Sequence, residues 1–277
     1  MNCFICSNHA ELVTNEPYED RVISVFQCSD CDIIFNMDMT DTVSPDYHDI
    51  KIDDSHIWLQ SYHKSHAFKQ FFGKVKKLGD LKDFALIDYG CGTAGFIKLM
   101  EQNEIHADFG SIVGVDASEK QIAYGRTVVK SDLICSATFP VDKINALPQK
   151  KILITMWDVL EHIRNPHIFL ETYSQLDKEV YLFFSVPAAK PMEYKYKLNK
   201  LIGRKFSFMP WEHVTYFTPK GIGLFTKKLN YRHIETYPVV CYERQNSLFE
   251  FIRRIIFKIT SLNINIAPQL GAILRIK

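Results

Sequence analysis

The stretch Asp88-Tyr89-Gly90-Cys91-Gly92-Thr93-Ala94-Gly95 decides the fold expected for this chain of 277 residues. It follows an apolar run, Ala85–Asp88, with the composition of a buried strand, and it leads into an apolar helical pattern over Phe96–Asn103. Glycines at such a junction let the backbone turn tightly and approach a ligand closely. The sequence therefore predicts a strand, a tight turn and a helix, with a ligand at the turn.

Strand-like and helix-like segments continue to alternate along the chain after this turn. Further strands are predicted over Ser111–Asp116, Leu133–Cys135, Ile152–Met156 and Val180–Val186. Helices are predicted over Ser118–Val128 and Pro166–Leu176, and a helical stretch from Ser55 to Leu78 precedes the first strand. Because this alternation is typical of βαβ units, the expected fold class is α/β, with a Rossmann-like, doubly wound and mostly parallel sheet.

Four of the seven cysteines form two close pairs, Cys3-x-x-Cys6 and Cys28-x-x-Cys31. Two such turns supply the tetrahedral thiolate shell that Zn²⁺ prefers, and a closed shell of this kind indicates a structural ion. Strands are predicted on either side of the second pair, at Val22–Gln27 and Ile33–Asn36. A segment of about 40 residues has too little core to fold alone, so metal binding would supply the missing free energy. We therefore predict a small zinc ribbon, with disulfides or unrelated thiols as the alternatives.

The composition is that of a globular protein, with 47% hydrophobic residues and a net charge of +1, which argues against broad nucleic-acid binding. The sequence shows neither a charged leader with an apolar stretch nor an apolar run of the roughly 20 residues that span a bilayer, so we expect a cytoplasmic protein. The predicted layout is a zinc ribbon over 1–40, a linker and leading helix over 41–80, and a catalytic domain over 81–277 with a basic, aromatic insertion at about 188–217.

A ligand at the glycine turn has two candidate identities. Asp116 ends the second strand, where it can accept hydrogen bonds from both hydroxyls of a ribose. Gly90-x-Gly92-x-x-Gly95 also fits the dinucleotide fingerprint, with Asp116 about 20 residues further on. Asp88, however, would repel a pyrophosphate and suits the cationic ammonium and sulfonium of S-adenosylmethionine (SAM). The charge favours SAM; an NAD-dependent oxidoreductase and a glycine turn without a ligand are the alternatives.

Four motifs carry a resemblance to a known family. They are the turn at 88–95, Asp116, the run Trp157-Asp158-Val159-Leu160-Glu161-His162 followed by Asn165-Pro166, and His213-Val214-Thr215-Tyr216-Phe217-Thr218-Pro219. Together they resemble the class I SAM-dependent methyltransferases. The third is similar to a segment of ubiquinone-biosynthesis-type enzymes, and the fourth, with the cysteine pairs, to a bacterial subgroup that carries an N-terminal zinc ribbon and often modifies sugars or other small molecules. Ala94 departs from the commonest turn, which has glycine there, and we expect cofactor binding to survive this change.

The resemblance implies which residues bind SAM. Contacts are expected from Asp88, Tyr89, Gly90, Cys91, Gly92, Gly95, Asp116, Ala117, Ala137 and Trp157. The loop Ser136-Ala137-Thr138 would lie near the adenine, while Trp157 and Asp158 would flank the methionine or the acceptor.

Methyl transfer from a sulfonium is an in-line displacement, and holding donor and acceptor in line supplies most of the catalysis. A hydroxyl or amine acceptor also benefits from a general base, for which His162, His213 and Asp158 are the candidates; a structural, hydrogen-bonded role is the alternative for each histidine. Asp158, Glu161 and His162 are spaced at i, i+3 and i+4, so on one helix they would share a face and could hold a divalent metal.

The predicted acceptor is a small molecule or a glycan precursor, methylated on oxygen or nitrogen. Six Lys and Arg residues and a single acid, Glu193, lie between Lys190 and Lys205, with aromatic residues among and after them. As a lid, this insertion would favour a phosphorylated or carboxylated acceptor, such as a nucleotide-linked sugar. The same composition fits single-stranded RNA or a solvated loop.

The stretch from Ser247 to Leu262 is amphipathic and basic, so it would either touch a membrane surface or, the favoured reading, pack on its own domain or a second subunit. Two further functions remain alternatives. One is an RNA methyltransferase that uses the ribbon for recognition, and the other is a catalytically silent zinc-ribbon interaction protein. The sequence indicates neither the acceptor atom nor the oligomeric state.

Overall fold

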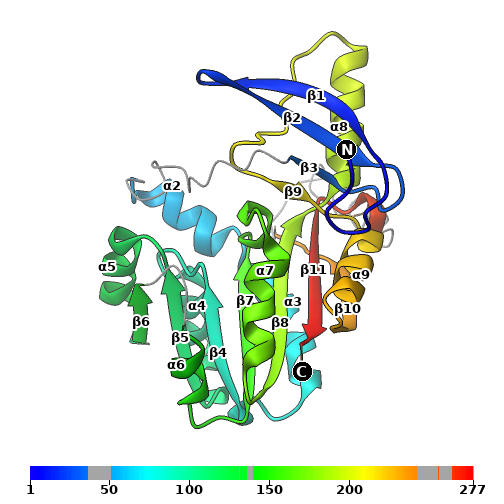
Figure 1. Cartoon of the computed structure of the whole chain (residues 1–277). Coiled ribbons are helices and arrows are strands. Elements are labelled where there is room, and N and C mark those ends of the chain that lie inside the picture. The colour runs from blue at the N-terminus through cyan, green and yellow to red at the C-terminus, as the bar shows by residue number, and fades with distance from the viewer. Residues whose placement is uncertain (37–50, 131, 136–139, 242–254, 256–263, 277) are drawn as a thin grey trace.

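The computed structural model describes residues 1–36, 51–130, 132–135, 140–241, 255 and 264–276. These residues form a seven-stranded sheet with helices on both faces and a smaller four-stranded sheet at one end of it (Figure 1). The strand order in the larger sheet is β10-β11-β8-β7-β4-β5-β6. The structure thus has a main α/β layer arrangement with an additional β-module.

Five neighbouring strands of the larger sheet run parallel: β4 (Phe84–Tyr89), β5 (Ser111–Asp116), β6 (Asp132–Cys135), β7 (Lys151–Trp157) and β8 (Glu179–Pro187). β11 (Gln269–Arg275) pairs antiparallel with β8, and β10 (Arg232–Pro238) pairs antiparallel with β11. The chain moves outward from β4 to β6 and then returns to β7 on the other side of β4. This reversal places a ligand-binding switch point at the carboxyl ends of β4 and β7. The predicted fold class is confirmed.

The helices cover the sheet and its carboxyl edge. Before β4 lie α2 (Asp54–Ile57), the π-helix η1 (Trp58–Tyr62), α3 (Ser65–Val75) and the 3-10 helices η2 (Lys76–Leu78) and η3 (Leu81–Asp83). Between the strands lie α4 (Gly95–Gln102), η4 (Ile105–Asp108), α5 (Glu119–Val128), α6 (Val141–Asn145), η5 (Leu160–His162), α7 (Pro166–Glu171), η6 (Thr172–Gln175), α8 (Ala189–Leu201), α9 (Pro219–Lys228) and η7 (Ile264–Ile266). The strands and helices predicted from the sequence pattern are present, although the leading helical stretch is divided into several short elements.

The central strands are buried on both faces, which explains their continuous apolar sequences. In β4, Ala85 and Ile87 face one hydrophobic cluster while Phe84 and Leu86 face another. The second cluster is rich in aromatic rings.

Among the described residues, no helix is both long and apolar enough to cross a membrane.

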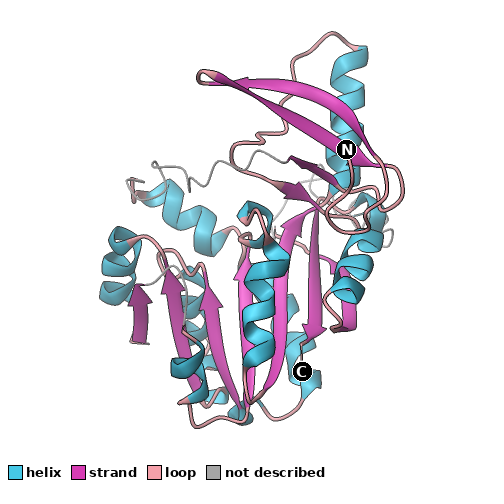
Figure 2. Ribbon diagram, in the orientation of Figure 1, coloured by secondary structure: helices cyan, strands magenta, loops and turns pink. Residues whose placement is uncertain are grey.

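The smaller sheet joins the N-terminus to a distant part of the chain (Figure 2). β1 (Ala10–Tyr18) and β2 (Arg21–Cys28) form a hairpin, β3 (Ile34–Asn36) pairs with β2, and β9 (Thr215–Tyr216) pairs with β3. The Thr218 hydroxyl donates to the Cys31 carbonyl, and Gly221 lies so close to Ile33 that a Cβ would overlap it. The N-terminal segment therefore folds against the rest of the chain, and the domain division at residues 40 and 80 stays a prediction.

The insertion predicted at about 188–217 contains the helix α8 and the strand β9, so its alternative reading as a loop is wrong. Most of its aromatic rings are used in packing: Tyr196, Phe206 and Phe208 cluster with Val25, and Trp211 stacks on Tyr18 with 4.8 Å between ring centroids. These rings are therefore not free to stack on an acceptor or on RNA bases, in contrast to the sequence-based expectation.

Three predictions concern residues that the structure does not describe. They are the linker that begins at residue 41, described only from residue 51 onward, the loop at 136–138 with Ala137, and the amphipathic stretch at 247–262, of which Ile255 alone is described.

Candidate functional site

The glycine turn after β4 is built from left-handed residues. The φ angles of Gly90 and Gly92 are 74° and 54°, a region that glycine adopts without strain. The backbone amides of Gly90 and Cys91 both donate to the Val115 carbonyl, at 2.7 and 3.0 Å, and thereby tie the turn to β5. A Cβ at Gly90 would overlap the Val159 side chain. The glycines are thus required for the turn itself and for the close packing of the loop after β7.

Ala94 also adopts a left-handed conformation, with φ 61° and ψ 29°, at the N-cap of α4. A left-handed conformation costs a residue with a Cβ about 1–2 kcal/mol. The departure from glycine noted in the sequence therefore falls on a position where the backbone itself favours glycine. The fold tolerates the alanine, whose side chain is fully buried.

Two buried carboxylates lie at neighbouring strand ends beside this turn. Asp116 accepts hydrogen bonds from the backbone amides of Gly92 and Ser118, each at 2.8 Å. Asp88 accepts a hydrogen bond from the Thr155 hydroxyl at 2.8 Å. Burial raises the pKa of Asp88 to about 7, against the lowering effect of the Thr155 hydrogen bond. The turn therefore offers a negative, desolvated environment, which suits a cationic ligand.

Gln60, on the π-helix η1, was not singled out from the sequence. Its side-chain oxygen accepts hydrogen bonds from the Thr93 amide and hydroxyl at 2.7 and 2.6 Å, and its side-chain nitrogen donates to Gln121 at 2.9 Å. A glutamine in a helical pattern gives no sequence signal of such a role. π-Helical turns, however, are frequent at functional sites. Gln60 connects the leading helices to the glycine turn.

The run after β7 divides between the core and the carboxyl edge of the sheet. The Trp157 ring is buried in the aromatic cluster, 4.4 Å from the Phe183 centroid and 5.4 Å from the Phe71 centroid. The sequence predicts that Trp157 flanks the methionine or the acceptor, but its ring points into the core instead. A contact between SAM and another part of Trp157 stays a prediction.

Asp158 follows with a φ of 54° and is held by an ion pair. Its carboxylate lies 2.8 Å from the Lys64 ammonium and accepts hydrogen bonds from Ser185, at 2.8 Å, and from Gln269. Although burial acts in the opposite direction, Lys64 lowers the pKa of Asp158. A carboxylate with three such partners is a weak base.

Asp158 lies before the 3-10 helix that carries Glu161 and His162, and its backbone is left-handed. The prediction that these three residues share one helix face is therefore wrong.

Glu161, His162 and His213 instead come together, and we refer to them as the histidine group. Their ligand atoms all lie within 4.8 Å of one another, and the two imidazole centroids are 5.0 Å apart. The group is held by the backbone, because the Val214 amide donates to the Glu161 carbonyl at 2.8 Å. Two candidate bases from distant parts of the sequence are thus neighbours, with a buried carboxylate between their segments.

The hydrogen bonds of the two histidines define their neutral tautomers. The Nδ1 of His162 lies 2.7 Å from the Glu212 carbonyl, which can only accept. The Nδ1 of His213 lies 3.0 Å from the Tyr216 hydroxyl, which already donates to the Phe208 carbonyl and so accepts from the ring. Both rings therefore carry their proton on Nδ1 and keep a lone pair on Nε2.

Burial disfavours the charged form of each residue in this group. Burial and the neighbouring His162 lower the pKa of His213 to about 4, and burial lowers that of His162. Burial also raises the pKa of Glu161 well above its usual range. Chemically, the two free Nε2 atoms can accept a proton from a reactant, or together with Glu161 they can bind a transition metal.

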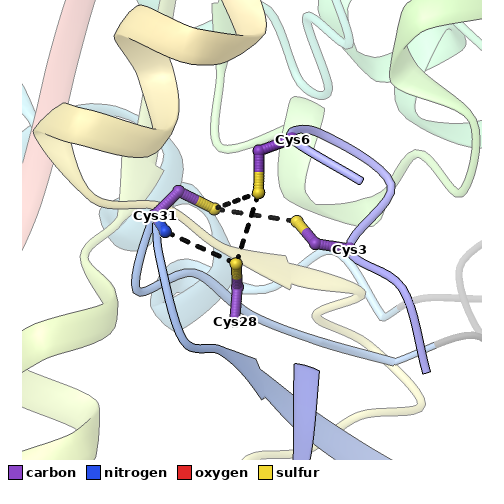
Figure 3. A group of neighbouring side chains, drawn as sticks. All are labelled: Cys3, Cys6, Cys28 and Cys31. Carbon is purple, nitrogen blue, oxygen red and sulfur yellow. Dashed lines mark hydrogen bonds between the residues drawn. The ribbon is translucent and has the colours of Figure 1, made fainter. Parts of the chain in front are cut away.

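The four cysteines form a second, separate cluster (Figure 3). Their sulfurs all lie within 4.8 Å of one another, with 3.6 Å between Cys3 and Cys31 and 3.4 Å between Cys6 and Cys28. Tetrahedral zinc with Zn–S bonds of about 2.3 Å separates its sulfurs by about 3.8 Å. All four cysteines are free rather than paired in disulfides, so the arrangement fits a Zn²⁺ ion.

The surroundings of the cysteine cluster also suit thiolates. The Ile5 amide donates to the Cys3 sulfur and the Cys31 amide to the Cys28 sulfur, each at 3.4 Å. Donors of this kind stabilise negative sulfur. The hydrogen bond between Cys3 and Cys31 lowers the pKa of Cys3 to about 5 and raises that of Cys31, so it favours a thiolate on one of the two.

Comparison with known proteins identifies the family of the chain. A family model described as a methyltransferase domain matches residues 62–236, which is more than half of the chain. The chain therefore belongs to the methyltransferase domain family, and it is a class I SAM-dependent methyltransferase. This assignment removes the NAD-dependent oxidoreductase from the alternatives. Comparison with curated protein sequences gives no match.

Three solved structures of methyltransferases are similar to this chain. A chain of the complex between the Haloferax volcanii Trm112 methyltransferase activator and a methyltransferase is 11% identical and superposes with a TM-score of 0.50, covering 80% of this chain and 92% of its own. A SAM-dependent methyltransferase from Archaeoglobus fulgidus is 17% identical, with a TM-score of 0.47 and coverage of 80% and 100%. The plantazolicin methyltransferase BpumL, solved with S-adenosylhomocysteine (SAH), is 15% identical, with a TM-score of 0.49 and coverage of 83% and 92%.

Proposed function

We propose that this enzyme transfers the methyl group of SAM to an oxygen or nitrogen atom of a small-molecule or glycan-precursor acceptor, with the histidine group as the source of the general base. The observation that carries the proposal is the pair of Nε2 lone pairs on His162 and His213, brought to the carboxyl edge of the sheet where the glycine turn lies. The His162 side chain is 44% exposed, so a reactant can reach it.

The proposal assigns SAM to the glycine turn. Asp88 and Asp116 would bind its cationic and ribose parts, and the described residues proposed to contact it are Asp88, Tyr89, Gly90, Cys91, Gly92, Gly95, Asp116, Ala117 and Trp157. The support is the pair of buried carboxylates at the ends of β4 and β5, since a positively charged ligand offsets the cost of burying them.

A neutral imidazole can take the proton of a hydroxyl or amine group as the methyl group is transferred. In the proposed step, the acceptor atom bonds to the methyl carbon, the sulfur–carbon bond breaks to leave SAH, and the acceptor proton passes to Nε2. A positioned base of this type contributes about 10²–10⁴-fold to the rate. The pKa of His213 lies near 4, so its Nε2 is unprotonated at neutral pH, although this imidazole is a weaker base than an ordinary histidine.

The same lone pairs support a second role for the histidine group, as a site for a divalent metal that orients the acceptor. Two imidazoles and a carboxylate are a ligand set that zinc, iron and manganese accept. The proposed site contains Glu161, His162 and His213, and it replaces the trio with Asp158 that the sequence suggested.

The N-terminal ribbon is proposed to bind one structural Zn²⁺ through Cys3, Cys6, Cys28 and Cys31, as in the bacterial subgroup with this layout. Reduced thiols of this kind persist in a reducing compartment, which supports a cytoplasmic location. An RNA acceptor remains the second candidate, but the packed aromatic rings of the insertion favour a small acceptor.

The test is a set of single-turnover measurements once an acceptor is found by screening nucleotide-linked sugars and other anionic small molecules. His162→Ala and His213→Ala should each lower the methyl-transfer rate about 10²–10⁴-fold while leaving SAH affinity unchanged. His233→Ala is the matched control, since His233 lies exposed on β10. Glu161→Gln separates the two roles, because a metal site would lose bound metal in this variant. Wild-type rates in both histidine variants would contradict the proposal.

A further inference from the structure

Helix α8 carries an apolar stripe on its outer side. Tyr194, Leu198, Leu201 and Ile202 are 54%, 57%, 83% and 52% exposed, so no described part of the chain covers them. Their spacing of i, i+4, i+7 and i+8 places them on one side of a helix. In Figure 1, α8 stands beyond the end of the large sheet beside the β1–β2 hairpin. The stripe is therefore a projecting apolar surface.

The opposite side of α8 is fixed to the rest of the molecule. The Tyr196 hydroxyl donates to the Val13 carbonyl at 3.2 Å, and Gln27 donates to the Glu193 carboxylate at 3.0 Å. Lys190 lies 3.2 Å from Asp32. The helix is thus anchored to the N-terminal sheet, and among the described residues nothing covers the stripe on its outer side.

Positive charge surrounds the stripe. Lys195, Lys200, Arg204 and Lys205 are all exposed. Glu193, the sole acid from 189 to 205, is buried. Its carboxylate forms ion pairs with the ammonium groups of Lys190 and Lys197, at 3.0 and 2.5 Å. Its charge is therefore already neutralised. The four exposed cations flank the apolar stripe, with the ammonium groups of Lys195 and Lys200 5.6 and 5.8 Å from the centroids of the Phe206 and Tyr196 rings.

We propose that α8 and the turn after it form a docking surface for an anionic lipid membrane. An exposed apolar stripe flanked by lysine and arginine is the pattern by which helices lie in a lipid headgroup layer, with the aliphatic chains inserted and the cations on the anionic headgroups. Single-stranded nucleic acid is instead bound on aromatic platforms. Here the outer face is mostly aliphatic, and Tyr196, Phe206 and Phe208 are packed inward. The chemistry of the surface thus fits lipid better than RNA.

The experiment is co-sedimentation of the full-length protein with vesicles of phosphatidylcholine alone or mixed with phosphatidylglycerol. The wild type should bind the mixed vesicles only, and less tightly as salt is added. Leu198→Ser combined with Leu201→Ser should weaken this binding about tenfold or more. Lys200→Glu combined with Lys205→Glu should weaken it by about fivefold or more per residue.

Matched controls lie elsewhere on the surface. Ile168, on α7, is 58% exposed and Lys77 is exposed on η2, so Ile168→Ser and Lys77→Glu should bind as the wild type does. All variants should keep the wild-type melting temperature and SAH affinity, since the changed side chains are exposed. Absence of wild-type binding, or equal binding by the α8 variants, would overturn the proposal. Binding of a single-stranded RNA oligonucleotide in place of vesicles would assign the surface to nucleic acid.

Discussion

The cysteine cluster and the catalytic edge, by which we mean the glycine turn, Asp116 and the histidine group, are assembled in different ways. All four cysteines come from the first 31 residues, and three of them are buried. The histidine group combines η5 with a segment about 50 residues later, and His162 is half exposed. A closed shell of soft ligands suits an ion that holds the fold, whereas an open group of bases can admit a reactant. On the proposed function, the first region stabilises the fold and the second carries out the chemistry.

The two regions are nevertheless connected. The Asn36 amide, in β3, donates to the Val214 carbonyl at 3.0 Å, and the Val214 amide donates to the Glu161 carbonyl at 2.8 Å. We therefore expect loss of the cysteine cluster to disturb the positions of the histidine group more than those of the glycine turn, which is hydrogen-bonded to β5.

Cys28→Ser gives the largest expected effect, because it removes one ligand of the closed shell. We expect loss of bound zinc and a decrease of about 3 kcal/mol or more in the free energy of unfolding. Metal analysis and thermal unfolding measure both. Cys241→Ser is the control, since Cys241 lies outside the cluster and donates to Gln269. A wild-type protein that is folded and contains no zinc would break the comparison.

Asp116→Ala should weaken SAM binding about tenfold or more, because it removes the proposed acceptor of the ribose hydroxyls and the partner of the Gly92 amide. Zinc content should stay at the wild-type level. Calorimetric titration with SAM and SAH measures the change. The affinity of Asp116→Asn, which keeps one acceptor oxygen, should lie between those of the wild type and Asp116→Ala. Unchanged affinity would mean that the cofactor binds elsewhere.

The pKa of Asp88, near 7, predicts a pH dependence of cofactor binding. Since a cationic ligand favours the carboxylate, affinity for SAH should rise about tenfold per pH unit below 7 and level off above it. The raised pKa also means that the folded state binds an extra proton between about pH 4 and 7, so this carboxyl group contributes less stability as pH rises through that window. Asp88→Asn should remove both dependences, and a pH-independent wild type would contradict the assignment.

Ala94→Gly should have the smallest effect and the opposite sign. Relief of the left-handed alanine offsets the greater freedom of an unfolded glycine, so we expect the free energy of unfolding to rise by at most about 1 kcal/mol. Ala67→Gly, at a buried position in the first turn of α3, should lower it by up to about 1 kcal/mol. Equal destabilisation by both changes would show that the backbone at Ala94 is not strained.

The same contrast explains what could be predicted from the sequence. The strands, the glycine turn and the cysteine pairs are local patterns, and the structure has them where the pattern indicates. The sequence pattern did not identify Gln60, Lys64 or Gln269 as site residues, because their partners lie far away in sequence. Gln60 binds Thr93, and both Lys64 and Gln269 bind Asp158. His162 and His213 were each selected from the sequence, but their proximity depends on how the segment after α8 returns to η5. The left-handed backbone at Asp158 moved this residue off the predicted helix face.

The pairing of Ile34 with Tyr216 has a consequence for synthesis of the chain. The hairpin is translated before the strand that completes its sheet and before the glycine that receives Ile33, both of which follow more than 180 residues later. Contacts of such long range form slowly, and an unpaired edge strand can meet other chains in the meantime. Early capture of zinc by the two cysteine pairs would give the nascent hairpin a stable structure during this interval, before its permanent neighbour exists.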